Sequence, residues 1–166
     1  VIQLRTFSKI LFPGMRVGWI VAHKTIIDKI IMLKQSVDLC TPSFSQPILA
    51  EYIKQGKMRR SIENAIECYK PKLKAMLDAL GKYMPEEVKW SMPTGGMFLW
   101  LTLPERIDTK DIFMTAIEHD VAYVIGRPFH CDRSGGNTMR LNYSFPSVEQ
   151  IEKGIQRLSG AIKAVL

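Results

Sequence analysis

The chain has 166 residues, of which 46% are hydrophobic and 23% charged, and this balance excludes a disordered or fibrous protein. No apolar run approaches the roughly 20 residues of a membrane-spanning helix, and the first residues do not form a signal peptide. The net charge of +7 is dispersed, and its densest cluster, between Lys54 and Lys74, has the spacing of a solvated helix face. We therefore expect neither a membrane nor a nucleic-acid partner for this chain.

The first half of the chain predicts two strands followed by three helices. β-branched and aromatic residues identify the strands, and apolar residues at intervals of three and four identify the helices. Thr25 is expected to cap the first helix, Gly81 to end the longest one and Pro71 to kink it. The expected elements are a strand over 1–4, a buried strand over 16–22, and helices over 26–37, 48–53 and 58–80.

The second half predicts an α+β pattern, in which two strands and a helix are followed by two further strands and a helix. Thr109 is expected to cap the first of these helices, and Ser147 with Gln150 forms a capping box for the last one. The expected elements are strands over 87–92 and 97–103, a helix over 109–117, strands over 121–125 and 138–144, and a helix over 148–165.

The three cysteines, Cys40, Cys68 and Cys131, are odd in number, and no two of them have the C-x-x-C spacing. This pattern predicts neither a disulfide framework nor a zinc site. We interpret the three side chains as small apolar packing groups, and we expect a reducing, cytoplasmic compartment.

The segment TFSKILFPGMRVGW near the start of the chain combines several reactive and anion-binding groups. Burial or a nearby cation lowers the pKa of a lysine amine, so a residue such as Lys9 can form a Schiff base. Thr6 and Ser8 carry hydroxyls that suit phosphate oxygens, and Arg16 carries a guanidinium that binds phosphate in a bidentate manner. The turn expected at Pro13-Gly14 would fold the arginine back toward the lysine. These groups suit an aldehyde cofactor that carries a phosphate.

The order T-F-S-K-x-x-x-P-G-x-R-x-G-W resembles the cofactor-lysine segment of fold-type I, pyridoxal phosphate (PLP)-dependent aminotransferases of class I/II. Three later segments resemble the same family in the same order: PTGGMFLW at 93–100, GRPFH at 126–130 and MRLNYS at 139–144. The resemblance covers essentially the whole chain and is closest to the aminoadipate, kynurenine and aromatic aminotransferase group. It implies an α/β fold, with the tail of the large α/β/α domain over 1–70 and a small α+β domain over 71–166.

The resemblance also implies a role for each of five residues. Lys9 forms the Schiff base with PLP and carries a proton between the substrate Cα and the cofactor. Thr6, Ser8 and Arg16 hold the phosphate of PLP. Arg140 binds the α-carboxylate of the substrate, a role that a planar and permanently charged guanidinium suits, although a strand arginine is elsewhere a common ion-pair partner.

Other residues near these motifs leave alternatives open. Arg5 stands where the family commonly has glycine, and Ile10 stands where it often has threonine. Arg127-Pro128 replaces a small or acidic pair, so Arg127 either favours substrates with acidic side chains or points to solvent. Gly95-Gly96 is either a close approach to a ligand or a plain turn. Four aromatic residues are expected in the core: Trp19, Phe98, Trp100 and Tyr143.

PLP chemistry also needs an acidic group at the pyridine nitrogen and an aromatic residue stacked on the ring. In the family these lie upstream of the lysine, whereas only eight residues precede Lys9 here. We therefore expect a C-terminal part of a longer aminotransferase, inactive by itself. The parent would be a cytoplasmic homodimer that transfers amino groups between L-amino acids and 2-oxo acids.

Two other functions are compatible with parts of this pattern. The chain resembles the aminotransferase-like effector domain of PLP-sensing transcription regulators, in which a DNA-binding helix-turn-helix precedes that domain. A small α+β interaction domain without a cofactor is the other alternative, and the spacing of Lys9 and Arg16 argues against it.

Overall fold

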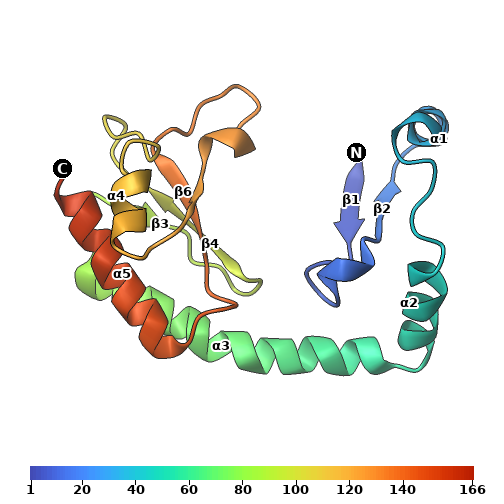
Figure 1. The fold of residues 1–166 in the computed structure, drawn as a ribbon, viewed down its shortest axis with the longest axis horizontal. Coiled ribbons are helices and arrows are strands. Elements are labelled where there is room, and N and C mark those ends of the chain that lie inside the picture. Colours follow the sequence, from blue (N-terminus) through green and yellow to red (C-terminus); the bar gives the residue numbers. More distant parts are fainter. The chain divides into compact units, whose positions relative to one another are not determined.

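The computed structural model describes residues 1–166 and divides into two compact units, Val1–Ala65 and Ile66–Leu166, each with its own sheet (Figure 1). The division falls inside a long helix, α3 (Lys57–Tyr83), rather than in a loop. No helix of the structure combines the length and the apolar character that crossing a membrane requires.

The first unit begins with an antiparallel hairpin in which β1 (Gln3–Thr6) pairs with β2 (Gly18–Val21). A Cβ added at Gly18 would lie 2.8 Å from the carbonyl oxygen of Arg5, so the strands approach this closely only because residue 18 is glycine. Both strands are exposed throughout, so the expectation of a buried strand over 16–22 is wrong for this chain.

Two helices follow the hairpin, α1 (Lys24–Val37) and α2 (Ser45–Lys54). The N-cap of α1 is His23 and not the expected Thr25, because the His23 side chain accepts a hydrogen bond from the Thr25 backbone N–H. Helix α2 begins three residues before the expected Ile48 and includes Pro47 in its first turn, where the missing N–H has no intrahelical partner to lose.

The first unit contains almost no core of its own. Leu49 is its single buried hydrophobic residue, whereas the apolar side chains of α1 include the exposed Ile31, Met32, Leu33 and Val37. An amphipathic helix is normally stabilised by burying its apolar face, so these side chains form a surface that suits further protein.

Helix α3 continues through Pro71 and ends at Tyr83, two residues beyond the expected stop at Gly81. A proline inside a helix removes one backbone hydrogen bond, and here it does not end the helix. The last part of α3 buries Met76, Ala79 and Leu80 in the hydrophobic core of the second unit.

The second unit contains a four-stranded antiparallel sheet in the order β3-β4-β6-β5. Its strands are β3 (Lys89–Trp90), β4 (Phe98–Thr102), β5 (Val124–Ile125) and β6 (Thr138–Asn142). Alternate residues Leu99, Leu101, Met139 and Leu141 are buried in one core with apolar residues of α3 and α5 (Val148–Lys163). The other face of β4 and β6 carries Phe98, Trp100 and Arg140.

The capping box of α5 is confirmed, since Gln150 N–H donates to Ser147 Oγ at 3.2 Å and Ser147 N–H donates to Gln150 Oε1 at 2.8 Å. The expected cap at Thr109 is wrong, because α4 (Phe113–Glu118) starts after Ile112. Thr109 is instead buried, and its N–H donates to the carbonyl oxygen of Gly136 at 2.8 Å. The residue thus ties the chain before α4 to the segment before β6.

The strands expected over 87–92 and 121–125 are each reduced to two residues. Cys40, Cys68 and Cys131 are free and exposed, so their interpretation as packed apolar side chains is wrong for this chain.

Candidate functional site

Four of the five residues expected to act on a cofactor or substrate lie at the end of β1 or in the connection between β1 and β2, where Thr6 ends the strand and Ser8, Lys9 and Arg16 follow it. The two ends of this connection are held together, because Phe7 N–H donates to the carbonyl oxygen of Val17 at 3.1 Å. The ring of Phe12 meets that of Tyr52 in α2 edge-to-face, with centroids 5.6 Å apart. The Tyr52 hydroxyl lies 2.5 Å from Ser61 Oγ in α3, so the loop rests on an anchored side chain.

Lys9 lies in a tight turn at the start of this loop. The backbone N–H groups of Ile10 and Leu11 both donate to the carbonyl oxygen of Phe7, at 3.2 and 2.9 Å. Lys9 itself is exposed, and the turn presents its side chain at the surface of the first unit.

The hydroxyls of Thr6 and Ser8, which are predicted to bind a phosphate, lie side by side. Their oxygens are 3.1 Å apart, and Ser8 N–H also donates to Thr6 Oγ1 at 3.1 Å. The alternate residues 6 and 8 are therefore brought to one place by the turn that presents Lys9.

Arg16 follows the short 3-10 helix η1 (Pro13–Met15), which confirms the turn expected at Pro13-Gly14. Its backbone is left-handed, with φ 53° and ψ 41°, a conformation that costs a residue with a Cβ about 1 kcal/mol. Its Nη1 donates to the carbonyl oxygen of Pro13 at 3.3 Å. Arg16 thus occupies a backbone conformation that favours glycine, and such outliers motivate a functional hypothesis for the side chain.

Replacing Arg16 separates the backbone effect from the side-chain effect. Because glycine adopts the left-handed region without a steric penalty, Arg16→Gly should leave the protein about 1 kcal/mol more stable than Arg16→Ala. Both variants should lose phosphate affinity equally, since both lack the guanidinium. Urea unfolding and titration with PLP measure the two quantities, and a cofactor affinity equal to that of the unmodified protein would contradict the assigned role.

The loop fits a phosphorylated aldehyde in its chemistry. Two hydroxyls, a guanidinium and a primary amine lie within residues 6–19, and this segment contains no acidic residue that would repel an anion. The hydroxyl and guanidinium groups donate hydrogen bonds to phosphate oxygens, and a lysine amine condenses with an aldehyde.

Arg140 lies in β6 of the second unit, paired with Trp100 of β4 and with Val124 of β5. Its Cζ atom is 4.0 Å from the ring centroid of Phe98 and 4.9 Å from that of Phe129. The side chain takes part in none of the ion pairs of the structure. The expected alternative, a structural ion pair on the strand, is therefore not realised within this chain.

The aromatic residues around Arg140 form a connected group. Phe129 meets Trp100 edge-to-face with centroids 5.4 Å apart, and the ring of His130 lies 6.2 Å from Trp100. Sequence reasoning missed Phe129 as a neighbour of Arg140. The signal that would have found it is the GRPFH segment, which contains the short 3-10 helix η2 (Arg127–Phe129) and is hydrogen-bonded to β6 through Gly126.

Of the four aromatic residues expected in the core, Tyr143 is confirmed, at 1% exposure and with its hydroxyl donating to the carbonyl oxygen of Gly95 at 3.3 Å. Phe98 and Trp100 are half-buried on the face that carries Arg140, and Trp19 is 41% exposed, so the expectation is wrong for these three.

Arg127 is engaged in contacts within the second unit. Its Nη2 lies 2.5 Å from Asp108 Oδ2, and its Nη1 donates to the carbonyl oxygen of Arg133 at 3.0 Å. The backbone N–H of Lys110 and, secondarily, Arg127 hold the pKa of Asp108 below its usual value. These contacts fasten the GRPFH segment, a structural role that differs from both expected alternatives, the selection of acidic substrates and a side chain that points to solvent. At Gly96, φ is 88°, so the backbone conformation of the turn by itself accounts for a glycine there.

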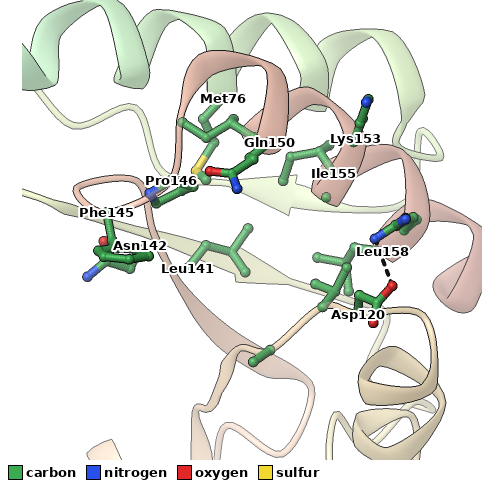
Figure 2. Close-up of a pocket in the computed structure, with 15 residues that line it drawn as sticks. Met76, Asp120, Leu141, Asn142, Phe145, Pro146, Gln150, Lys153, Ile155 and Leu158 are labelled. Carbon is green, nitrogen blue, oxygen red and sulfur yellow. Dashed lines mark hydrogen bonds and ion pairs between the residues drawn. The ribbon is translucent and has the colours of Figure 1, made fainter.

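A cavity of about 420 Å³ lies between α3, α5 and β6 of the second unit (Figure 2). Leu141, Ile155 and Leu158 supply apolar walls, and Asp120 pairs there with Arg157 at 3.1 Å. Leu141 neighbours Arg140 on the strand and faces the other side of the sheet, so the cavity is separate from the aromatic group. None of the five expected site residues lines it.

The sequence model of the family "Aminotransferase class I and II" matches residues 1–158, and the chain therefore belongs to this family. An aromatic-amino-acid aminotransferase from Thermococcus litoralis is 52% identical over 163 residues, which are 98% of this chain and 39% of that protein.

Solved structures give the same result. A kynurenine aminotransferase from Pyrococcus horikoshii has a TM-score of 0.90 at 48% identity, over 100% of this chain and 41% of that one. The α-aminoadipate aminotransferase LysN from Thermus thermophilus, complexed with N-(5'-phosphopyridoxyl)-L-leucine, has a TM-score of 0.87 at 40% identity, over 99% of this chain and 42% of that one. The chain thus has the fold of part of an aminotransferase, and it spans about two fifths of the length of these relatives.

A more distant relative belongs to another class of protein. The HTH-type transcriptional regulator YdfD of Bacillus subtilis is 30% identical over 163 residues, which are 98% of this chain and 33% of that protein. Regulators therefore occur among the relatives at lower identity than the enzymes.

Proposed function

We propose that the chain is part of a PLP-dependent aminotransferase that moves amino groups between an L-amino acid and a 2-oxo acid. In this proposal residues 1–70 belong to the cofactor-binding domain, and residues 71–166 form most of the small domain. The observation that carries it is the β1–β2 loop, where Lys9 lies in the turn that brings the hydroxyls of Thr6 and Ser8 within 3.1 Å of each other. Family membership supports the same conclusion.

Each of the five residues then has a defined task. Thr6, Ser8 and Arg16 donate hydrogen bonds to the phosphate of PLP. When bound, PLP supplies an electron sink that acidifies the hydrogen on the substrate Cα. Lys9 anchors the cofactor and moves the proton at that Cα, and Arg140 binds the α-carboxylate and so orients the substrate.

The substrate role of Arg140 has a direct test. In the complete enzyme, Arg140→Ala should lower kcat/KM for amino transfer by about 100-fold or more, because a charge-assisted bidentate contact to the carboxylate is lost. The assay follows transfer from several L-amino acids to 2-oxoglutarate. Arg157→Ala is the matched control, since this exposed arginine pairs only with the exposed Asp120 and should change kcat/KM less than about twofold.

The regulator remains the second candidate because of the likeness to YdfD. A polypeptide that contains a helix-turn-helix domain and binds PLP without transferring amino groups would support it. Amino transfer with catalytic turnover, from a polypeptide without such a domain, would support the enzyme. We further propose a homodimer in the cytoplasm, for which the exposed apolar side chains of the first unit offer interface surface.

A further inference from the structure

We propose that Phe98 and Phe129 are positioning residues, which hold the guanidinium of Arg140 ready for the substrate carboxylate and determine how strongly it prefers a carboxylate over a neutral group. The inference rests on the proposed function, because it takes the α-carboxylate as the ligand of Arg140. Neither ring needs to touch the reacting atoms for this role.

The two rings reach Arg140 from different parts of the fold. Phe98 pairs with Asn142 in the β4–β6 register, so it lies diagonally opposite Arg140 on the same face of the sheet. Phe129 ends η2, which follows β5 and lies on the other flank of β6. The guanidinium carbon lies above both rings, 4.0 Å from one centroid and 4.9 Å from the other.

Aromatic faces attract the cation but provide no lone pair for its N–H groups. They therefore restrict the orientation of the guanidinium without using up its hydrogen-bonding capacity. A carboxylate partner from within the chain would have neutralised the charge, and the structure has none at this position. Arg140 is also half-buried, so water screens its charge less than at an open surface.

The Phe129 ring is itself held in place. It meets Trp100 edge-to-face at 5.4 Å, and its backbone N–H donates to the carbonyl oxygen of Gly126 at 2.9 Å. Arg127, two residues earlier, forms an ion pair with Asp108 at 2.5 Å. Phe129 is half exposed, so its replacement by leucine removes a ring beside Arg140 without emptying the core.

The test compares two probes on the complete, PLP-loaded enzyme by isothermal titration. 3-Phenylpropionate carries a carboxylate, and 3-phenylpropionamide is its neutral counterpart, so the ratio of their affinities measures the contribution of the guanidinium. Phe98→Leu and Phe129→Leu should each lower this ratio about fivefold. Phe98→Tyr and Phe129→Tyr should retain it, because tyrosine also presents an aromatic face.

Phe113→Leu is the matched control. Phe113 is also half-buried and aromatic, but it contacts Tyr123 at 5.3 Å, so its replacement should leave the ratio unchanged. Arg140→Ala distinguishes the carboxylate role of Arg140 from the positioning role of the two rings. An unchanged ratio in Arg140→Ala would overturn the carboxylate role in the proposed function. A ratio that collapses in Arg140→Ala but stays at the original value in Phe98→Leu and Phe129→Leu would overturn the positioning role alone.

Discussion

Replacing Lys9 with alanine in the complete enzyme is expected to lower the rate of amino transfer by about 10⁴-fold or more, because the variant lacks both the anchoring amine and the group that moves the Cα proton. The proposed phosphate contacts from Thr6, Ser8 and Arg16 do not involve Lys9, so PLP should still bind to this variant, although more weakly. A single-turnover assay measures the rate, and an absorbance titration with PLP measures binding and shows whether the spectrum depends on Lys9.

Two further variants make the outcome interpretable. Lys9→Arg keeps a positive charge but provides no amine that can be deprotonated, so it should be as inactive as the alanine variant. Lys24→Ala removes an exposed lysine of the same unit, which pairs with Asp28 at 2.8 Å, and should retain full activity. Turnover in Lys9→Ala close to that of the original protein would exclude Lys9 as the catalytic amine.

Local sequence patterns predicted the elements whose signal lies within one short stretch of sequence. The apolar spacing placed all the long helices, and the Ser147–Gln150 capping box appears with both of its hydrogen bonds. Thr109 shows where this reasoning fails. A threonine before an apolar run is typical of a cap, but here its hydroxyl donates to the carbonyl oxygen of Thr138 at 2.9 Å, a partner 29 positions away. Such a partner depends on tertiary packing, which local propensity does not describe.

The candidate site shows the same difference between groups that are close in sequence and groups that tertiary packing brings together. The β1–β2 loop could be predicted because its groups lie within one short stretch of sequence and are closed by one hairpin. The surroundings of Arg140 could not, because Phe98 and Phe129 reach it through strand register and through η2. The expectation that Trp19 is buried failed for a different reason. An apolar side chain predicts burial, but its type does not tell which polypeptide segment covers it.

The GRPFH segment links the stability of the second unit to the geometry around Arg140. Gly126 is buried, and its N–H donates to the carbonyl oxygen of Thr138 at 2.8 Å. A Cβ added there would overlap the Thr138 hydroxyl and lie 2.6 Å from that carbonyl oxygen. Relief of this overlap requires β6 or η2 to move. Arg140 lies in β6 and Phe129 lies in η2, so either movement changes the contact between these two side chains.

Gly126→Ala is therefore expected to lower the free energy of unfolding by about 3 kcal/mol, because the added methyl meets strand backbone that cannot move without breaking the sheet pairing. Urea unfolding measures the loss. Gly154→Ala is the matched control, since this glycine lies in α5 with no atom within 4 Å of an added Cβ, and alanine there should stabilise the helix by about 0.5–1 kcal/mol. Equal stability of the two variants would contradict the close approach of Gly126 to β6. In the folded fraction of Gly126→Ala, displacement of Phe129 should also reduce the preference of Arg140 for a carboxylate, which connects the packing of one glycine to substrate recognition.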